Sequence, residues 1–453
     1  MVEALVTQAG KIAYVGNLNT AQSKYKNAAQ VNLNSKTLLP GFIDPHSHFD
    51  MVSNTMGQAN LNPPPVGKID SMDKLLQALK DYKIDNNIAD GEWIYGWGYN
   101  ESQLKEGRHP TKADIDKVLP NNSVYLQHTS GHMGVANSKA LAALNITADT
   151  KNPEGGNIAR VKGSSEPNGL VQETAMYPFM RRMLEVLEPN QAKFFEQTQD
   201  YYAKNGMTTF SQPYLTPVPD CKKDCRGLPS ISQDALNEMF AKAYKHDNQL
   251  FIHNNGDGAT DMIIKAHEYA VKKTGQAADK DRRTVPIHAQ FARPDQLEAF
   301  KKYKMLPSFF TNHAYFWGDV HVQNLGKKRA DFLSPIATAD KMGLKYTNHS
   351  DDTVTPVDPL FTVWSAVNRT SRSGKIIGTN ERATPYQALK AITTNAAYEY
   401  YEENSKGTLT KGKLADLVIL DSNPLTVNAD KLKDIHVVTT IKEGKIIYQR
   451  PTK

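Results

Sequence analysis

Eight short apolar runs are the feature of this sequence that most constrains its fold. They read "TLLPGFID", "EWIYGWGY", "NSVYLQH", "GMTTFSQ", "QLFIHNN", "TVPIHAQ", "MLPSFFT" and "LKYTNHS". Segments with a helical pattern, such as "SMDKLLQALKDYKI" and "PNQAKFFEQTQDYYAKN", separate several of these runs. Strands that alternate with helices are typical of α/β proteins with a parallel sheet, and eight such units predict a (β/α)8 TIM barrel over residues 41–405.

The two ends of the chain and one long connection depart from this alternation. Residues 1–40 and 406–453 are β-rich and contain short runs with glycine turns, which predicts β-structure at both chain ends, unlike the middle of the chain. The connection at about residues 128–205 is far longer than a usual loop between a strand and a helix. Long insertions at the C-terminal face of a barrel usually shape a substrate pocket, and we expect the same here.

Composition excludes some functions. The net charge of +6 comes from 54 basic and 48 acidic residues spread along the chain, without the basic cluster of a nucleic-acid-binding protein. No run of apolar residues is long enough to predict a membrane span.

The N-terminus "MVEALVTQAGKIAYVG" does not read as a signal peptide, which favours a cytoplasmic protein. An exported or periplasmic protein is the alternative if a leader was removed. Cys221 and Cys225 form either a local disulfide or two free thiols.

Histidine and aspartate residues end several of the predicted strands. His46 and His48 follow the first run, and their spacing points both side chains to the same side of a strand. His253, His288 and Asp351 end the fifth, sixth and eighth runs. The C-terminal ends of barrel strands meet at one rim, and imidazole and carboxylate groups suit divalent metals. These residues therefore predict a metal site, with zinc as the default ion and iron, manganese or nickel as alternatives.

The same residues carry a resemblance to a known family. "GFIDPHSHF", the strand-end residues and the tail "GTLTKGKLADLVILDSNP" resemble the amidohydrolase superfamily. Within it, the chain most resembles the branch of the YtcJ-like proteins and N-substituted formamide deformylases. That similarity lies in "WGYNESQLKEGRHPTKADID", "SGHMGVANSKAL", "HNNGDGATD", "HAQFARPDQLEAFKKYKMLPSFFTNHAYFWGD" and "SDDTVTPVDPLFTVWSAVNR". The resemblance covers nearly the whole chain and implies a barrel with a small β-sandwich built from both chain ends.

The resemblance also implies a reaction. The expected protein is a metal-dependent hydrolase that cleaves a non-peptide C–N bond in a small amide or N-substituted formamide, with Asp351 as the proton shuttle. His349 alternates with Asp351 and is expected to support the site. Two other functions stay open: deamination of a cyclic amidine by the same chemistry, and a non-catalytic binding protein. Superfamily members are often dimers, so a homodimer is one expected assembly.

One departure from the superfamily concerns the number of metals. Many members bridge two metals with a carboxylated lysine at the end of the fourth strand, where this chain has Ser211 and Gln212. Glu173, in "NGLVQETA", is the predicted replacement because a carboxylate can bridge two cations. The alternative is that Glu173 only begins a helix. One or two metals per chain are therefore expected.

Five further residues are predicted to hold the substrate. They are His132 in "SGHMGVAN", His313, Tyr315 and Trp317 in "TNHAYFWGD", and Trp97 near the end of the second run. Aromatic rings beside a histidine could sandwich an apolar substituent and hydrogen-bond a carbonyl oxygen. The alternative for Tyr315 and Trp317 is packing at the rim of the barrel.

Overall fold

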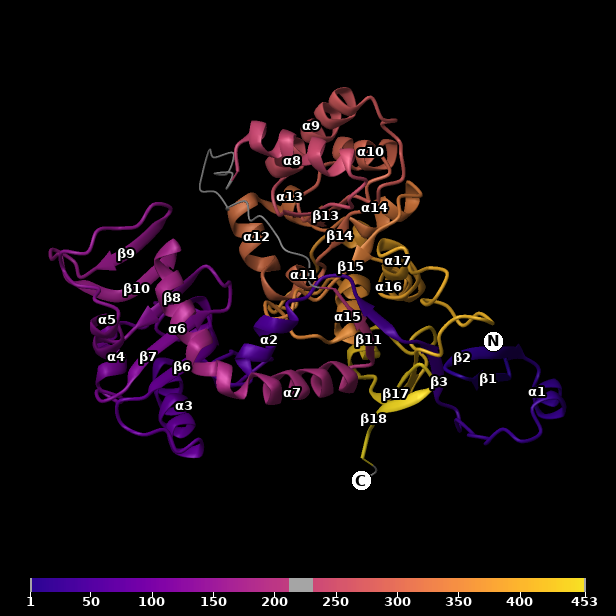
Figure 1. Cartoon of the computed structure of the whole chain (residues 1–453), viewed down its shortest axis with the longest axis horizontal. Coiled ribbons are helices and arrows are strands. Elements are labelled where there is room, and N and C mark those ends of the chain that lie inside the picture. Colours follow the sequence, from indigo (N-terminus) through magenta and orange to yellow (C-terminus); the bar gives the residue numbers. More distant parts are fainter. Residues whose placement is uncertain (1, 212–230, 452–453) are drawn as a thin grey trace. The chain divides into compact units, whose positions relative to one another are not determined.

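The computed structural model describes residues 2–211 and 231–451, which form two compact units (Figure 1). The first unit contains Met1–Ser47 and Asp200–Lys453, and the second contains His48–Gln199. Each unit is described by itself below. Gln212, Cys221 and Cys225, which the sequence analysis singled out, lie outside the described residues.

A parallel sheet forms the centre of the first unit. Its strand order is β12 (Phe251–Asn254), β13 (Val285–His288), β14 (Ser308–Phe309) and β15 (Thr347–Asn348). Two more strands, β4 (Phe42–Asp44) and β11 (Met207–Phe210), pair with each other in parallel. These strands are short, so the residues just beyond their ends are still buried.

Helices connect and follow these strands. They are α8 (Gln233–Lys245), α9 (Asp257–Thr274), α10 (Pro294–Lys302), α11 (Asn312–Phe316), α12 (Gly318–Leu325), α13 (Lys327–Asp331), α14 (Ile336–Lys341), α15 (Pro359–Asn368), η4 (Thr379–Glu381), α16 (Pro385–Ala391) and α17 (Thr394–Glu399). Local chemistry sets their ends. The side chain of Ser232 accepts a hydrogen bond from the backbone N–H of Ala235 at the start of α8, and Gly275 ends α9 in the left-handed conformation (φ 70°).

Both ends of the chain join in one antiparallel sheet of the first unit. The order is β18 (Lys445–Gln449), β17 (Val437–Lys442), β16 (Leu417–Leu420) and β3 (Thr37–Pro40), which places the indigo strand β3 beside the yellow C-terminal strands in Figure 1. The hairpin of β1 (Ala4–Gln8) and β2 (Lys11–Gly16) precedes the short helix α1 (Leu18–Lys24). Ile12 of this hairpin packs with Ala415 and Leu417 in a small apolar core. The 3₁₀ helix η5 (Ala429–Asp434) connects β16 to β17.

The second unit has a mixed six-stranded sheet. Its order is β5 (Ala59–Asn60), β6 (Trp93–Tyr99), β7 (Ser123–His128), β8 (Met133–Ala136), β10 (Pro167–Glu173) and β9 (Gly156–Arg160). The pairs β5–β6 and β6–β7 are parallel, and the other pairs are antiparallel. The helical segments are α2 (Phe49–Thr55), α3 (Met72–Asp85), η1 (Glu101–Gln103), α4 (Lys112–Asp116), α5 (Ser138–Ala143), η2 (Thr174–Met176), α6 (Tyr177–Leu187), η3 (Glu188–Asn190) and α7 (Gln191–Lys204), which continues into the first unit.

The α/β class predicted from the sequence is confirmed, since each of the eight apolar runs contains a strand and helices lie between strands that pair in parallel. Closure of these strands into one barrel stays a prediction, as do the predicted domain boundaries. None of the helices in the described ranges combines the length and the apolar character that crossing a bilayer requires.

Candidate metal centre

Three predicted ligands come together in the first unit. His46 lies two residues beyond β4, His288 ends β13, and Asp351 lies three residues beyond β15. Each offers a ligand atom, and these atoms all lie within 4.8 Å of one another. Nε2 of His46 is 3.0 Å from Oδ1 of Asp351. The three residues are 0%, 3% and 6% exposed, so the group could hold a metal ion away from bulk solvent.

Two further histidines surround His288. Its Nε2 lies 3.2 Å from Nδ1 of His253, and its Nδ1 lies 2.9 Å from Nε2 of His349. The other ring nitrogen of His349 lies 3.0 Å from the hydroxyl of Ser308. Ser308 and His349 therefore hold the His288 ring through Nδ1, so Nε2 is the ring nitrogen left to face a metal ion. This contact fits the supporting role expected for His349.

The backbone is unusual at two of these ligands. His288 and Asp351 have φ values of 70° and 54°, and Ala289, beside His288, has a φ of 41°. Positive φ is costly for residues with a side chain and is found where the surrounding structure holds it in place for function. The strand ends therefore turn abruptly where the ligand side chains leave the sheets.

A buried carboxyl group ties two of the ligand-bearing loops together. Oδ1 of Asp44 accepts hydrogen bonds from the backbone N–H groups of His46 (3.3 Å) and Ser350 (3.2 Å), and the hydroxyl of Ser350 donates to Oδ2. Asp44 is only 2% exposed, and burial raises its pKa to about 7. Asp44 is not among the site residues predicted from the sequence. Its position two residues before His46, on the same side of the strand, was the available signal.

The donor atoms fit a divalent transition metal. Burial lowers the pKa of His288 well below its ordinary value, so the ring is neutral and has a lone pair to offer. Two imidazole nitrogens and a carboxylate oxygen form a ligand set that zinc and similar ions accept. His46, His288 and Asp351 are three of the residues that the sequence predicted to hold the metal.

Four predicted residues belong to the second unit. His48 directly precedes α2. Nδ1 of His132 lies 3.3 Å from Oε2 of Glu173, and about half of each side chain is exposed. Glu173 ends β10 with a φ of 51° and directly precedes η2, as the alternative interpretation expected; its bridging role stays a prediction. Trp97 lies within β6 and is 6% exposed.

The three residues predicted after the seventh run occupy α11 and its end. The ring of His313 lies 4.5 Å from that of Trp317. Tyr315 contacts Phe361 and Trp364 edge-on, with ring centroids 5.2 and 5.7 Å apart. This environment favours a packing role for Tyr315, whereas His313 contacts polar groups that are considered below.

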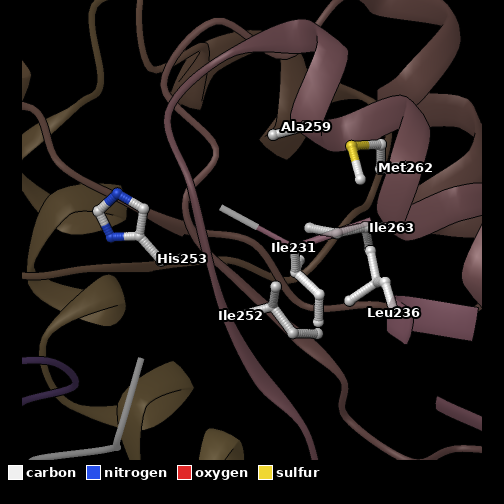
Figure 2. A pocket seen from close by; sticks show the side chains of 7 residues that line it. All are labelled: Ile231, Leu236, Ile252, His253, Ala259, Met262 and Ile263. Atoms are coloured by element: carbon white, nitrogen blue, oxygen red, sulfur yellow. The ribbon is translucent and has the colours of Figure 1, made fainter. Parts of the chain in front are cut away.

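A small cavity lies between β12 and the helices α8 and α9. It is lined by His253 and by six apolar side chains from β12, α8, α9 and the segment just before α8: Ile231, Leu236, Ile252, Ala259, Met262 and Ile263. In Figure 2 the His253 ring points away from these apolar side chains, as expected from the alternation of Ile252 and His253 along a strand. The cavity is therefore part of the packing between β12 and the helices that cover it.

Comparisons of sequence and structure relate this chain to known proteins. A sequence model of the amidohydrolase family matches residues 29–213 and 209–448. An N-substituted formamide deformylase from Arthrobacter pascens is 24% identical over 99% of this chain and 95% of its own length. The Bacillus subtilis (strain 168) protein YtcJ is also 24% identical, over 99% and 96%. An uncharacterized metal-dependent hydrolase from Pyrococcus horikoshii shares the fold, with a TM-score of 0.72, 21% identity and coverage of 94% and 95%. Because the family model matches most of the sequence, the chain belongs to the amidohydrolase family.

Proposed function

We propose that this protein is a metal-dependent hydrolase that cleaves the C–N bond of a small amide or N-substituted formamide. The observation that carries the proposal is the buried group of His46, His288 and Asp351, whose ligand atoms lie within 4.8 Å of one another in a chain of the amidohydrolase family. The similarity to an N-substituted formamide deformylase along nearly the whole chain supports this substrate class.

His46, His288 and Asp351 would hold a divalent cation, together with His253; the ligand role of His48 stays a prediction. We propose zinc because of the nitrogen and oxygen donors. A bound divalent ion supplies a water molecule of lowered pKa and polarises a carbonyl oxygen. Ser308 and His349 keep the His288 ring in one orientation, and Asp44 holds the loops of His46 and Ser350 together. These contacts keep the donor atoms in place before substrate arrives.

Asp351 is the proposed proton shuttle. Its carboxylate is buried beside His46, three residues beyond β15, where it can take a proton from the attacking water. It then gives the proton to the leaving amine, which departs as a neutral group. Trp317 is the proposed contact for the substrate in the first unit, and the roles predicted from the sequence for His132, Trp97 and Glu173 of the second unit stay predictions.

The test is a screen of N-formyl amines, simple amides and cyclic amidines with protein purified without added metal or chelator. Release of the amine or formate is measured for the wild type, for His288→Ala and for the control His246→Ala, which changes an exposed histidine. We expect hydrolysis by the wild type and the control. In His288→Ala, both the metal content, measured by elemental mass spectrometry, and the activity should fall.

Other outcomes of this screen would overturn the proposal. Ammonia release from cyclic amidines without amide hydrolysis would make the protein a deaminase. If the wild type takes up no ion even after incubation with zinc, the non-catalytic interpretation is correct. Full activity in His288→Ala would place the reaction elsewhere in the molecule.

A further inference from the structure

A second cluster of nitrogen-bearing side chains lies in the first unit. Gln290 follows β13, His313 lies in α11 and His321 lies in α12. Nε2 of Gln290 is 3.0 Å from Nδ1 of His313 and 3.2 Å from Nε2 of His321, and these two ring nitrogens are 3.1 Å apart. The three atoms therefore form a nearly equilateral triangle, with side chains contributed by three separate segments.

Hydrogen bonding alone does not satisfy this triangle. A neutral imidazole nitrogen either donates or accepts, but does not do both. If the amide donates to both rings, two lone pairs face each other at 3.1 Å. If one ring donates to the other, the N–H of the donating ring and an N–H of the amide face each other. If the amide is turned so that its oxygen faces the rings, at least one of the three contacts is still mismatched. Every assignment of protons leaves one contact repulsive.

A cation at the centre removes the conflict because all three groups can then point lone pairs inward. Ligands at the usual zinc distances leave neighbouring donor atoms roughly 3.3 Å apart in a tetrahedral site. The observed separations of 3.0, 3.1 and 3.2 Å are close to this spacing. Gln290 is 2% exposed, and its Oε1 has no hydrogen-bond partner in the described ranges. Turning the amide breaks no hydrogen bond of Oε1 and brings this oxygen to face the two rings.

The charge state and the surroundings suit cation binding. Burial lowers the pKa of His313 well below its ordinary value and that of His321 to about 4, so both rings are neutral near pH 7. Both residues are nevertheless only partly buried, which gives an ion a path from solvent. The ring of Trp317 lies 4.5 Å from His313, and the ring of Phe291 lies 5.2 Å from His321. These rings restrict the positions that the imidazoles can take.

This cluster is distinct from the candidate metal centre. The ring of Phe310 contacts both groups, with centroids 4.6 Å from His313 and 4.9 Å from His349. None of the ligands assigned to the metal centre belongs to the triangle. His313 was predicted from the sequence to bind substrate, and the contacts with Gln290 and His321 give it a different role.

We propose that Gln290, His313 and His321 form an additional binding site for a divalent transition metal of the zinc class. The three side chains supply two nitrogens and one oxygen, and water completes the coordination. The bound ion links the segment after β13 to α11 and α12. This site does not depend on which C–N bond the enzyme cleaves.

The test is zinc binding by the full chain. Wild type, His321→Ala and the control His246→Ala are equilibrated with zinc and dialysed, and zinc per chain is measured by elemental mass spectrometry. We expect His321→Ala to hold one zinc fewer than the wild type, and His246→Ala to hold as much as the wild type. Circular dichroism checks that each variant is folded; if His321→Ala is not, His321→Asn and His313→Ala are measured in the same way.

A second measurement isolates the site. The variant His46→Ala/His288→Ala lacks two ligands of the metal centre, and cobalt(II) should still give a visible absorption band in it. That band should vanish when His321→Ala is added. Wild-type zinc content in His321→Ala, or a folded His46→Ala/His288→Ala variant that binds neither zinc nor cobalt, would overturn the proposal. Amide hydrolysis by the wild type is recorded separately, so failure of this site is distinguishable from failure of the proposed function.

Discussion

Asp351 combines two tasks in the proposed reaction, because its carboxylate both contacts the metal-binding group and moves a proton. It is 6% exposed and lies 3.0 Å from Nε2 of His46. An asparagine at this position keeps the size and one oxygen of the side chain but does not accept a proton. The two tasks can therefore be separated by substitution.

The Asp351→Asn variant should lose roughly 10²- to 10⁴-fold in kcat, the usual contribution of a general base. Metal content should fall less than in His46→Ala, since an amide oxygen remains. The measurement is kcat on the best substrate of the screen together with metal per chain. The control is Asp149→Asn, which alters an exposed carboxylate of the second unit. Wild-type turnover by Asp351→Asn would remove the shuttle from the mechanism.

Glu399 makes the stability of the protein depend on pH. It is fully buried, burial raises its pKa from 4.5 to about 8, and Thr347 donates a 2.6 Å hydrogen bond to it. The folded protein therefore binds more protons than the unfolded chain between pH 4.5 and about 8. Through this window the free energy of unfolding should fall with rising pH, by at most about 1.4 kcal/mol per pH unit from this group.

The variant Glu399→Gln should lack this contribution. Its free energy of unfolding relative to the wild type should increase from pH 5 to pH 8, as measured by urea unfolding at several pH values. Two stability profiles that stay parallel across this range would show that Glu399 does not carry a raised pKa.

At the scale of elements, His46, His288 and Asp351 lie at or just beyond the ends of short strands, and glycines shape some of the longer connections. The segment between α15 and η4 contains two glycines with positive φ, Gly374 (83°) and Gly378 (72°). A Cβ added to Gly378 would lie 1.8 Å from the backbone oxygen of Asp331, whereas one added to Gly374 would meet no atom within 4 Å. An alanine would therefore strain the backbone at both positions, but only at Gly378 would its Cβ collide with a neighbouring atom.

Alanine at Gly374 should cost about 1–2 kcal/mol of unfolding free energy from the left-handed conformation alone. Gly378→Ala should cost clearly more, because the backbone near Asp331 must also move. Thermal or urea unfolding of both variants measures the difference. Equal losses in the two variants would show that the close approach to Asp331 relaxes without cost.

At the scale of the whole molecule, a metal ion would connect segments that are far apart in the chain. His46, His288 and Asp351 follow strands of two different sheets, and the sequence separation between the first and the last ligand spans most of the protein. An ion that binds only the folded state stabilises it by about 4 kcal/mol when its free concentration is 1,000 times the Kd.

Removal of metal with dipicolinate should therefore lower the Tm, and added zinc should restore it. The measurement is thermal unfolding of the same preparation before chelation, after chelation and after zinc is returned, with metal content verified at each stage. An unchanged Tm in protein shown to be metal-free would mean that the ion contributes little to folding.

The sequence by itself determined the local features of this protein. Each of the eight apolar runs contains a strand, because periodicity depends on neighbouring residues, and the positions of His46, His288 and Asp351 near strand ends predicted their convergence. The motifs identified the amidohydrolase family, which the family comparison confirmed. The closed barrel, the bridging role of Glu173 and the identity of the metal stay predictions.

Only the tertiary structure decided which side chains meet across the fold. Asp44 binds Ser350 across 306 positions of sequence, and His288 meets His349 across 61. The triangle of Gln290, His313 and His321 likewise depends on how α11 and α12 lie against the segment after β13. Such contacts are set by the packing of strands and helices and by turns with positive φ. No local pattern of residue types encodes them, and they emerge when distant segments are buried together.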